Sequence, residues 1–128
     1  MPARGRRATG PDRRALGAAG EQAAADWYEA GGYRVLDRNW RVREGELDLV
    51  ALAPDGVVVF CEVKTRTSDR FGAPVEAVTT TKQRRIRTLA AQWLAAHPEV
   101  GGAIRFDVAS VLVASDAPVV VEVVQAGF

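Results

Sequence analysis

GELDLVALAPDGVVVFCEVK, residues 45–64, contains two alternating runs separated by a turn at Pro54-Asp55-Gly56. Side chains two residues apart on a strand point to the same face, so Glu62 and Lys64 should project together. A hairpin can place Asp48 beside them. Two carboxylates and an ammonium on a buried sheet are costly unless they are paired or bind a metal ion. The stretch therefore predicts a β-hairpin that carries a divalent-metal site with a lysine next to it.

The composition is that of an ordinary globular domain. The chain has 128 residues, of which 48% are apolar and 26% are charged, and this length suits one domain. We expect no membrane span, because no apolar run approaches about 20 residues, and no secretory signal, because no apolar core follows the first arginines. Cys61 is the only cysteine, which excludes an internal disulfide, a zinc ribbon and CxxC redox chemistry. Together these features favour the cytoplasm.

The distribution of positive charge is more informative than the net charge of +1. Basic residues crowd the start of the chain and recur later, at Arg4, Arg6, Arg7, Arg13, Arg14, Lys82, Arg84, Arg85 and Arg87. Both groups could contact phosphates. Charge runs are more often solvated, so these residues could instead be a solvated tail and a solvated helix face, and the sequence leaves both interpretations open.

The chain predicts a flexible basic tail at 1–10 and one nuclease-like domain over 11–128. The expected elements are a helix from about 12 to 30, strands at 33–38, 45–53 and 57–66, a helix from Pro74 or Val75 to 96, and strands at 104–113 and 119–124. The order is α-β-β-β-α-β-β, which predicts an α/β fold with a mixed central sheet flanked by helices.

Finer details concern the helices and one connection. The first helix is expected to bury a stripe of Leu16, Ala19, Ala23 and Trp27. Asn39-Trp40-Arg41 is expected to be a connection.

Several short segments occur in an order that resembles a known family. They are Gly20-Glu21, Gly32-Tyr33, 38–41, 45–50, Phe60 to Arg66, Lys82 with Arg85-Ile86, and 105–108. In this pattern the chain resembles the bacterial YraN family of endonuclease-like proteins. That family looks like a branch of the PD-(D/E)xK, or restriction-endonuclease-like, superfamily and is similar to archaeal Holliday-junction resolvases. Two positions depart from the pattern: Leu47 stands where the superfamily has proline, and Cys61 where an apolar residue is expected.

The resemblance implies catalytic roles for Asp48, Glu62 and Lys64. Asp48 and Glu62 would hold Mg²⁺ or Mn²⁺, with a carbonyl of Cys61 or Val63. Glu21 maps onto a first-helix glutamate that lies near the metal in junction resolvases. The structural alternatives are a strand-end aspartate bonded to a loop, a Glu–Lys neighbour pair, and a solvated helical glutamate.

Other residues are weaker candidates. Glu46 shares a strand face with Asp48 and is a secondary candidate. The candidates for nucleic-acid binding are Lys82, Arg66, Arg70, Arg85 and Trp40. Lys82 could instead extend from the rim of the core, and Trp40 could pack under a loop rather than stack on a base. Arg105 and Asp107 are expected to form a structural ion pair.

The function expected from this resemblance is metal-dependent hydrolysis of DNA phosphodiester bonds, including branched DNA such as four-way or flapped forms. The alternatives are a DNA-binding accessory protein of the same fold with little cleavage, and an interaction protein whose acid–lysine cluster only stabilises the sheet. A homodimer is also expected, because a nuclease that cuts two strands gains from two-fold symmetry and the strand 119–124 invites pairing if it lies at an edge. The alternative for that strand is a central position in a monomer.

Overall fold

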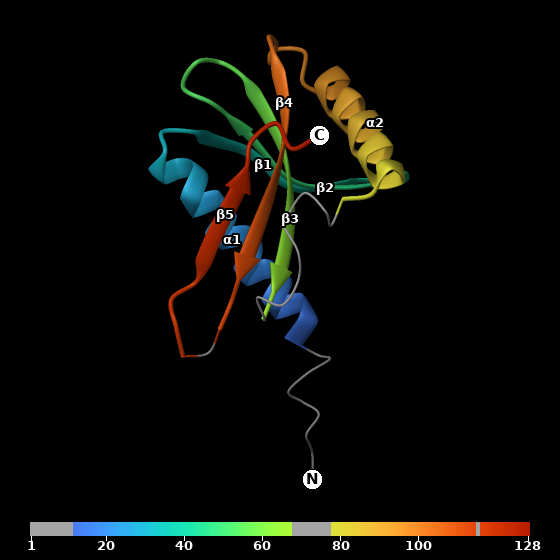
Figure 1. The fold of residues 1–128 in the computed structure, drawn as a ribbon. Coiled ribbons are helices and arrows are strands. Elements are labelled where there is room, and N and C mark those ends of the chain that lie inside the picture. The colour runs from blue at the N-terminus through green and yellow to red at the C-terminus, as the bar shows by residue number, and fades with distance from the viewer. Residues whose placement is uncertain (1–11, 68–77, 115) are drawn as a thin grey trace.

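The computed structural model describes residues 12–67, 78–114 and 116–128. The predicted tail, Arg70 and the expected helix start at Pro74 or Val75 lie outside these residues. The elements are α1 (Asp12–Ala30), β1 (Arg34–Val42), β2 (Gly45–Leu52), β3 (Val58–Arg66), α2 (Thr80–Ala96), β4 (Ile104–Leu112) and β5 (Val120–Val124). The predicted order and the mixed α/β class are confirmed (Figure 1).

The five strands form one sheet in the order β1-β2-β3-β4-β5. β3 and β4 are parallel, and every other neighbouring pair is antiparallel. A parallel pair needs a crossover connection, which α2 supplies. β3 pairs with β4 along its whole length, so it is the best-anchored strand of the sheet.

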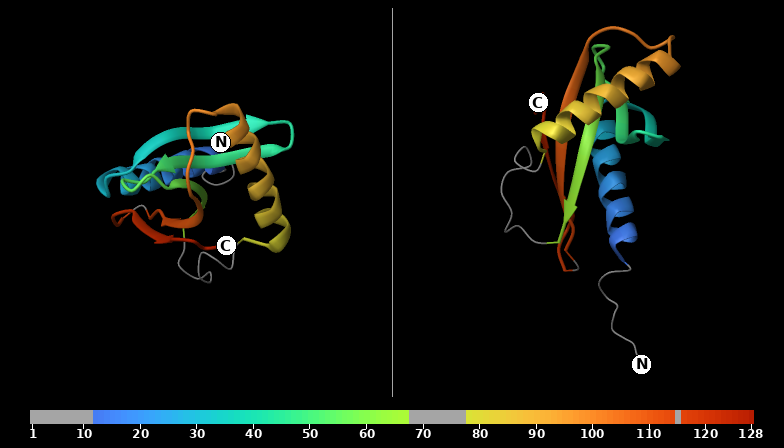
Figure 2. Two further views of the ribbon diagram at one scale, coloured as in Figure 1. Left: turned by 90° about the horizontal axis from the view of Figure 1, so that it is seen from above. Right: turned by 90° about the vertical axis from the view of Figure 1, so that its right-hand side faces the viewer.

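The two helices cover opposite faces of the sheet (Figure 2). Because strand side chains alternate, Phe60 of β3 belongs to the core that contains Trp93 of α2, whereas Cys61 belongs to the core under α1. Glu62 and Lys64 follow Phe60 at two-residue intervals and therefore lie on the α2 face. In the described residues no helix is long and apolar enough to cross a membrane.

The buried face of α1 is displaced from the predicted stripe. Ala24 and Tyr28 are fully buried, whereas Ala19 of that stripe is exposed. Gly20 continues the same face and lets the helix approach β3, because a Cβ at this position would lie 1.8 Å from Oγ1 of Thr65. Alanines occur on several sides of this helix, so the periodicity of apolar residues alone could not decide which side faces the sheet.

β1 is longer than expected. The predicted connection at Asn39-Trp40-Arg41 is wrong, since these residues belong to β1, which pairs with β2 as far as Val42. The register of this pairing shifts between Val35 and Asp37. Asn39 also has φ +49°, a left-handed conformation that asparagine adopts more easily than most residues.

α2 begins later than expected, at Thr80. Thr79 is its N-cap, and the Thr79 side chain accepts a hydrogen bond from the backbone N–H of Lys82 at 3.1 Å. The run of three threonines before Lys82 supplies this cap, a signal that the proline five residues upstream obscured.

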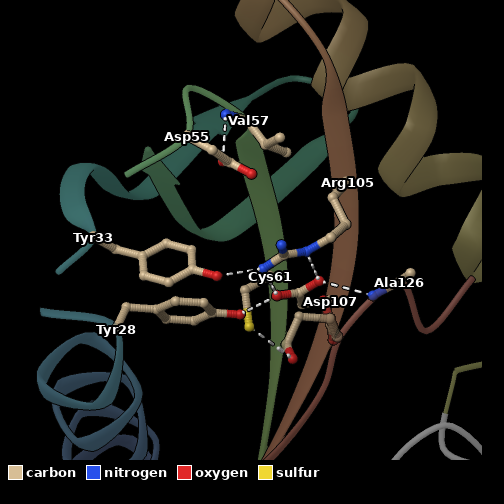
Figure 3. Close-up of polar contacts among 9 residues, drawn as sticks. Tyr28, Tyr33, Asp55, Val57, Cys61, Arg105, Asp107 and Ala126 are labelled. Carbon is tan, nitrogen blue, oxygen red and sulfur yellow. Dashed lines mark hydrogen bonds and ion pairs between the residues drawn. The ribbon is translucent and has the colours of Figure 1, made fainter. Parts of the chain in front are cut away.

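A buried carboxylate, Asp107, ties β4 to α1 and to the C-terminal segment (Figure 3). Arg105 donates to both carboxylate oxygens at 2.8 and 2.9 Å, the Tyr28 hydroxyl donates at 2.6 Å, and the backbone N–H of Ala126 donates at 3.0 Å. The predicted structural pairing of Arg105 with Asp107 is confirmed. Four hydrogen-bond donors satisfy the charge of Asp107, so its pairing with Arg105 stabilises the contact of β4 with α1 and the C-terminal segment.

β5 lies at one edge of the sheet and pairs only with β4. The alternative that this strand is central is therefore wrong. Val119 and Val120 are 46% and 50% exposed, as expected for an unprotected apolar edge. The homodimer stays a prediction.

Substitution of Gly20 tests the contact of α1 with β3. Gly20→Ala should lower the melting temperature, because the methyl group overlaps Thr65 and overpacking of this kind costs about 1–3 kcal/mol. The matched control is Gly17→Ala on the same helix, where a Cβ meets nothing within 4 Å. Alanine should stabilise the helix there by about 1 kcal/mol. Equal effects of the two substitutions in thermal unfolding would contradict this packing.

Candidate active site

The candidate site lies where β2 and β3 separate. Their paired registers run from Leu52 opposite Val58 to Leu49 opposite Cys61 and stop there. Beyond this point β2 continues with β1 alone, and β3 continues with β4 alone. The β1–β2 hairpin turns toward α2 (Figure 1), and its Gly45 lies against the side chain of Leu89. We call this opening the fork.

Asp48 is the first residue of β2 beyond the last paired position. Its Oδ2 accepts a hydrogen bond from the backbone N–H of Val63 at 2.9 Å. The carboxylate thus replaces the backbone acceptor that a continuing β2 strand would have offered. This bond fixes one oxygen of Asp48 against β3 at the fork.

Glu62 precedes that donor on β3 and is buried, with 7% of its surface exposed. Its Oε2 forms an ion pair with Nζ of Lys82, which reaches the sheet from the first turn of α2. Among the described residues Glu62 is thus paired with Lys82, and the alternative of a neighbour pair between Glu62 and Lys64 does not form. The lysine that faces the sheet from α2 makes the contact, because its side chain meets the α2 face of β3 directly.

Lys64 lies two residues beyond Glu62 on the same strand face and is half-buried. In the described part of the chain the Lys64 ammonium has no ion-pair partner. Its three N–H donors are thus available to an anion at the end of β3.

Glu21 of α1 completes the acidic group from the other face of the sheet. Asn39 holds it in place by donating from Nδ2 to Oε1 of Glu21 at 3.0 Å. Burial, followed by the negative charges of Glu62 and Glu21, raises the pKa of Asp48 to about 7. The Val63 N–H and the Lys82 ammonium act in the opposite direction and only partly offset this effect. Negative charge is therefore concentrated at the fork, and the repulsion between these carboxylates opposes the ionised form of Asp48.

Asp48 and Glu62 offer oxygen ligands of the kind that bind a hard divalent cation such as Mg²⁺, rather than the full set of protein ligands of a structural metal site. No group of three or more His, Cys, Asp or Glu side chains with metal-binding geometry occurs within 12–67, 78–114 and 116–128. Mg²⁺ commonly uses only one or two protein carboxylates and completes its octahedron with water and substrate phosphate. Asp48 and Glu62 are compatible with that mode, because Oδ1 of Asp48 takes no part in the hydrogen bond to Val63. A cation would also relieve the repulsion between the two carboxylates.

A groove runs along the fork with α1 as its floor. It consists of two hollows of about 430 and 440 Å³ that share Arg13, Gly17 and Glu21. The first hollow is bounded by the end of β3 and the second by the β1–β2 hairpin. We refer to both hollows together as the fork groove.

The predicted nucleic-acid contacts divide into separate locations. Arg66 lines the fork groove, Lys82 is held by Glu62, and Arg85 is exposed on α2 near Gly45. Trp40 packs partly buried against the α2 core, which agrees with the packing alternative. Arg70 lies outside the described residues.

Glu46, the secondary candidate, also lines the fork groove and forms an ion pair with Arg41, with 3.3 Å between the two side chains. The sequence analysis missed Asn39 and Arg41 as groove residues, and it named Arg13 and Arg14 only among the basic residues that could contact phosphates. A signal for the place of Arg13 existed, because Arg13 and Glu21 are eight residues apart with Gly17 midway and so share one face of a helix. The contribution of Asn39 and Arg41 depended on the extension of β1.

Comparison with protein families gives the relationship of this chain. The family model described as "Uncharacterised protein family UPF0102" matches residues 20–111. The chain belongs to this family. The match confirms the resemblance to the YraN family expected from the sequence.

Individual UPF0102 proteins align over most of the chain. A protein of Frankia alni is 53% identical over 114 residues, 89% of this chain and 94% of its own. A protein of Mycolicibacterium vanbaalenii is 56% identical over 104 residues, 80% of this chain and 85% of its own. A protein of Beutenbergia cavernae is 54% identical over 99 residues, 77% of this chain and 82% of its own. These relatives establish the family and leave the activity to be inferred from the site.

The raised pKa of Asp48 predicts how stability depends on pH. The folded state binds this proton more tightly than the unfolded state, so the stabilising contribution is present below about pH 4 and is lost as the pH rises toward 7. One such group changes the free energy of unfolding by at most about 1.4 kcal/mol per pH unit. Asp48→Asn keeps an acceptor for Val63 and should be more stable than the wild type at pH 8, with the difference shrinking toward pH 4.

Urea unfolding at several pH values measures this difference. The control is Asp55→Asn, which removes a carboxylate from the exposed turn at the other end of the β2–β3 hairpin, keeps an acceptor for the Val57 N–H, and should follow the wild type. A wild type as stable as Asp48→Asn at pH 8 would contradict the proposed charge repulsion.

Proposed function

We propose that the protein is a metal-dependent endonuclease that hydrolyses phosphodiester bonds in DNA, including branched DNA. The observation that carries the proposal is the fork itself. There, burial and the negative charge of Glu62 raise the pKa of Asp48, which the Val63 N–H holds against β3. Lys64 lies on the same strand face as Glu62. Structural carboxylates such as Asp107 have their charge fully satisfied, whereas those of the fork do not. Family membership and an α/β fold of the expected order agree with this proposal.

The residues would have separate roles. Asp48 and Glu62 would hold Mg²⁺ or Mn²⁺, which supplies a water of lowered pKa and neutralises charge on the phosphate. The Val63 N–H fixes the orientation of Asp48. Lys64 would donate to a phosphate oxygen or to the attacking water and stabilise negative charge as it develops. Lys82 compensates the charge of Glu62.

A second function is favoured by the Lys82–Glu62 ion pair. An ammonium already occupies one oxygen of Glu62, so the carboxylate pair is partly neutralised without a metal. The protein would then be a nucleic-acid-binding accessory protein of the same fold with little or no cleavage.

Cleavage assays separate the two functions. Linear, flapped and four-way DNA are incubated with Mg²⁺ or Mn²⁺ and the wild type, Asp48→Asn or Lys64→Met. The wild type should nick at least one substrate, and Lys64→Met should lower the rate by about 10²-fold or more, the usual effect of losing one preorganised donor. Arg84→Met, on the exposed side of α2, is the matched control for removal of a cation.

Unfolding curves for each variant ensure that lost activity is not lost fold. Full activity of Lys64→Met would remove that residue from the mechanism. No cleavage of any substrate by the wild type with either metal, together with DNA binding, would establish the accessory function instead.

A further inference from the structure

The shape and charge of the fork groove indicate a binding site for a ligand beside the proposed catalytic residues. Its floor is a single stripe of α1, with Arg13, Gly17 and Glu21 at four-residue spacing. One wall is the end of β3 with Arg66, and the other is the β1–β2 hairpin with Arg41. The groove is therefore bounded on both sides, and arginines lie around an acidic centre.

Gly17 keeps the floor of this groove open. A Cβ at Gly17 would meet nothing within 4 Å, so no packing contact requires glycine there. This contrasts with Gly20 one turn later, where Thr65 leaves no room for a side chain. Glycine inside a helix costs about 1 kcal/mol relative to alanine. Because Gly17 lines both hollows, its missing side chain leaves space inside the groove.

The size of the groove limits what can enter it. Each hollow, at about 430 and 440 Å³, falls within the range of about 300–1,000 Å³ typical of small-ligand clefts. That volume accommodates nucleotides of one strand, whereas a duplex is stiff and carries a backbone on both sides. The described groove residues include four arginines and no aromatic side chain, a composition that favours phosphate contacts over base stacking for this part of the groove.

We propose that the fork groove binds an unpaired DNA strand through its phosphates, with Arg13 and Arg14 as principal contacts. The preferred DNA is thus a duplex that carries a single-stranded branch. The proposal deepens the function proposed above by naming its substrate class, and it rests on that function only for the position of the cut. Strand binding itself requires neither a metal nor cleavage.

The test measures binding without metal, in EDTA, by fluorescence anisotropy. The probes are a blunt duplex and the same duplex with a single-stranded tail. The wild type should bind the tailed duplex about tenfold more tightly, the factor that corresponds to one charge-assisted hydrogen bond. The preference should decrease as salt is raised.

Two kinds of variant locate the binding in the groove. Gly17→Gln fills the floor with a good helix former and should abolish the preference, whereas Ala19→Gln, at an exposed position outside the groove, should keep it. The double variant Arg13→Ala/Arg14→Ala should also lose it, whereas Arg34→Ala, exposed at the other end of β1, should not.

Equal affinity of the wild type for both probes, or an unchanged preference in Gly17→Gln, would overturn the proposal. Cleavage of blunt duplex with Mg²⁺ but no preference for a tail would leave the nuclease function standing and remove this inference. A preference for the tail without cleavage of any DNA would do the reverse.

Discussion

The hydrogen bond from the backbone N–H of Val63 to the carboxylate of Asp48 determines the rest of the site. A side chain occupies the acceptor position that the β2 backbone vacates, so the two strands can part without leaving the Val63 donor unsatisfied. The β1–β2 hairpin is then free to turn and pack on α2. The same separation exposes the stripe of α1 that contains Glu21 and forms the fork groove.

Asp107, which is buried, and Asp48, which is half-buried, show how differently the surroundings of a carboxylate can treat its charge. Asp107 receives four donors and joins β4, α1 and the C-terminal segment. Partial burial and two other carboxylates raise the pKa of Asp48 to about 7, and its one backbone donor offsets this only in part. The first arrangement stabilises the fold, and the second opposes it. A site that retains such repulsion, with Lys82 compensating only in part, is better explained by a ligand than by stability.

The sequence predicted the fold class because alternation and turn signals are strong in residues 45–64 and the helices are bounded by Gly-Gly and proline. It also placed Glu62 and Lys64 on one face, since strand alternation is a local property. It did not predict which lysine pairs with Glu62, because the Lys82 contact depends on the approach of α2. Asn39 was missed as a site residue, and Arg13 was named only as a possible phosphate contact, for the same reason: they come together only when β1 continues past Asn39 and α1 lies against the fork.

Paramagnetic broadening by Mn²⁺ in amide NMR spectra tests the central claim most directly, because it locates a metal without requiring catalysis. The account predicts that substoichiometric Mn²⁺ broadens the amide signals of Asp48, Glu62 and Val63 first, and that Asp48→Asn greatly weakens this effect. Signals of Asp55 and Gly56, in the turn at the other end of the β2–β3 hairpin, should be affected least. Broadening centred on a different part of the chain, or none at the fork, would contradict the account.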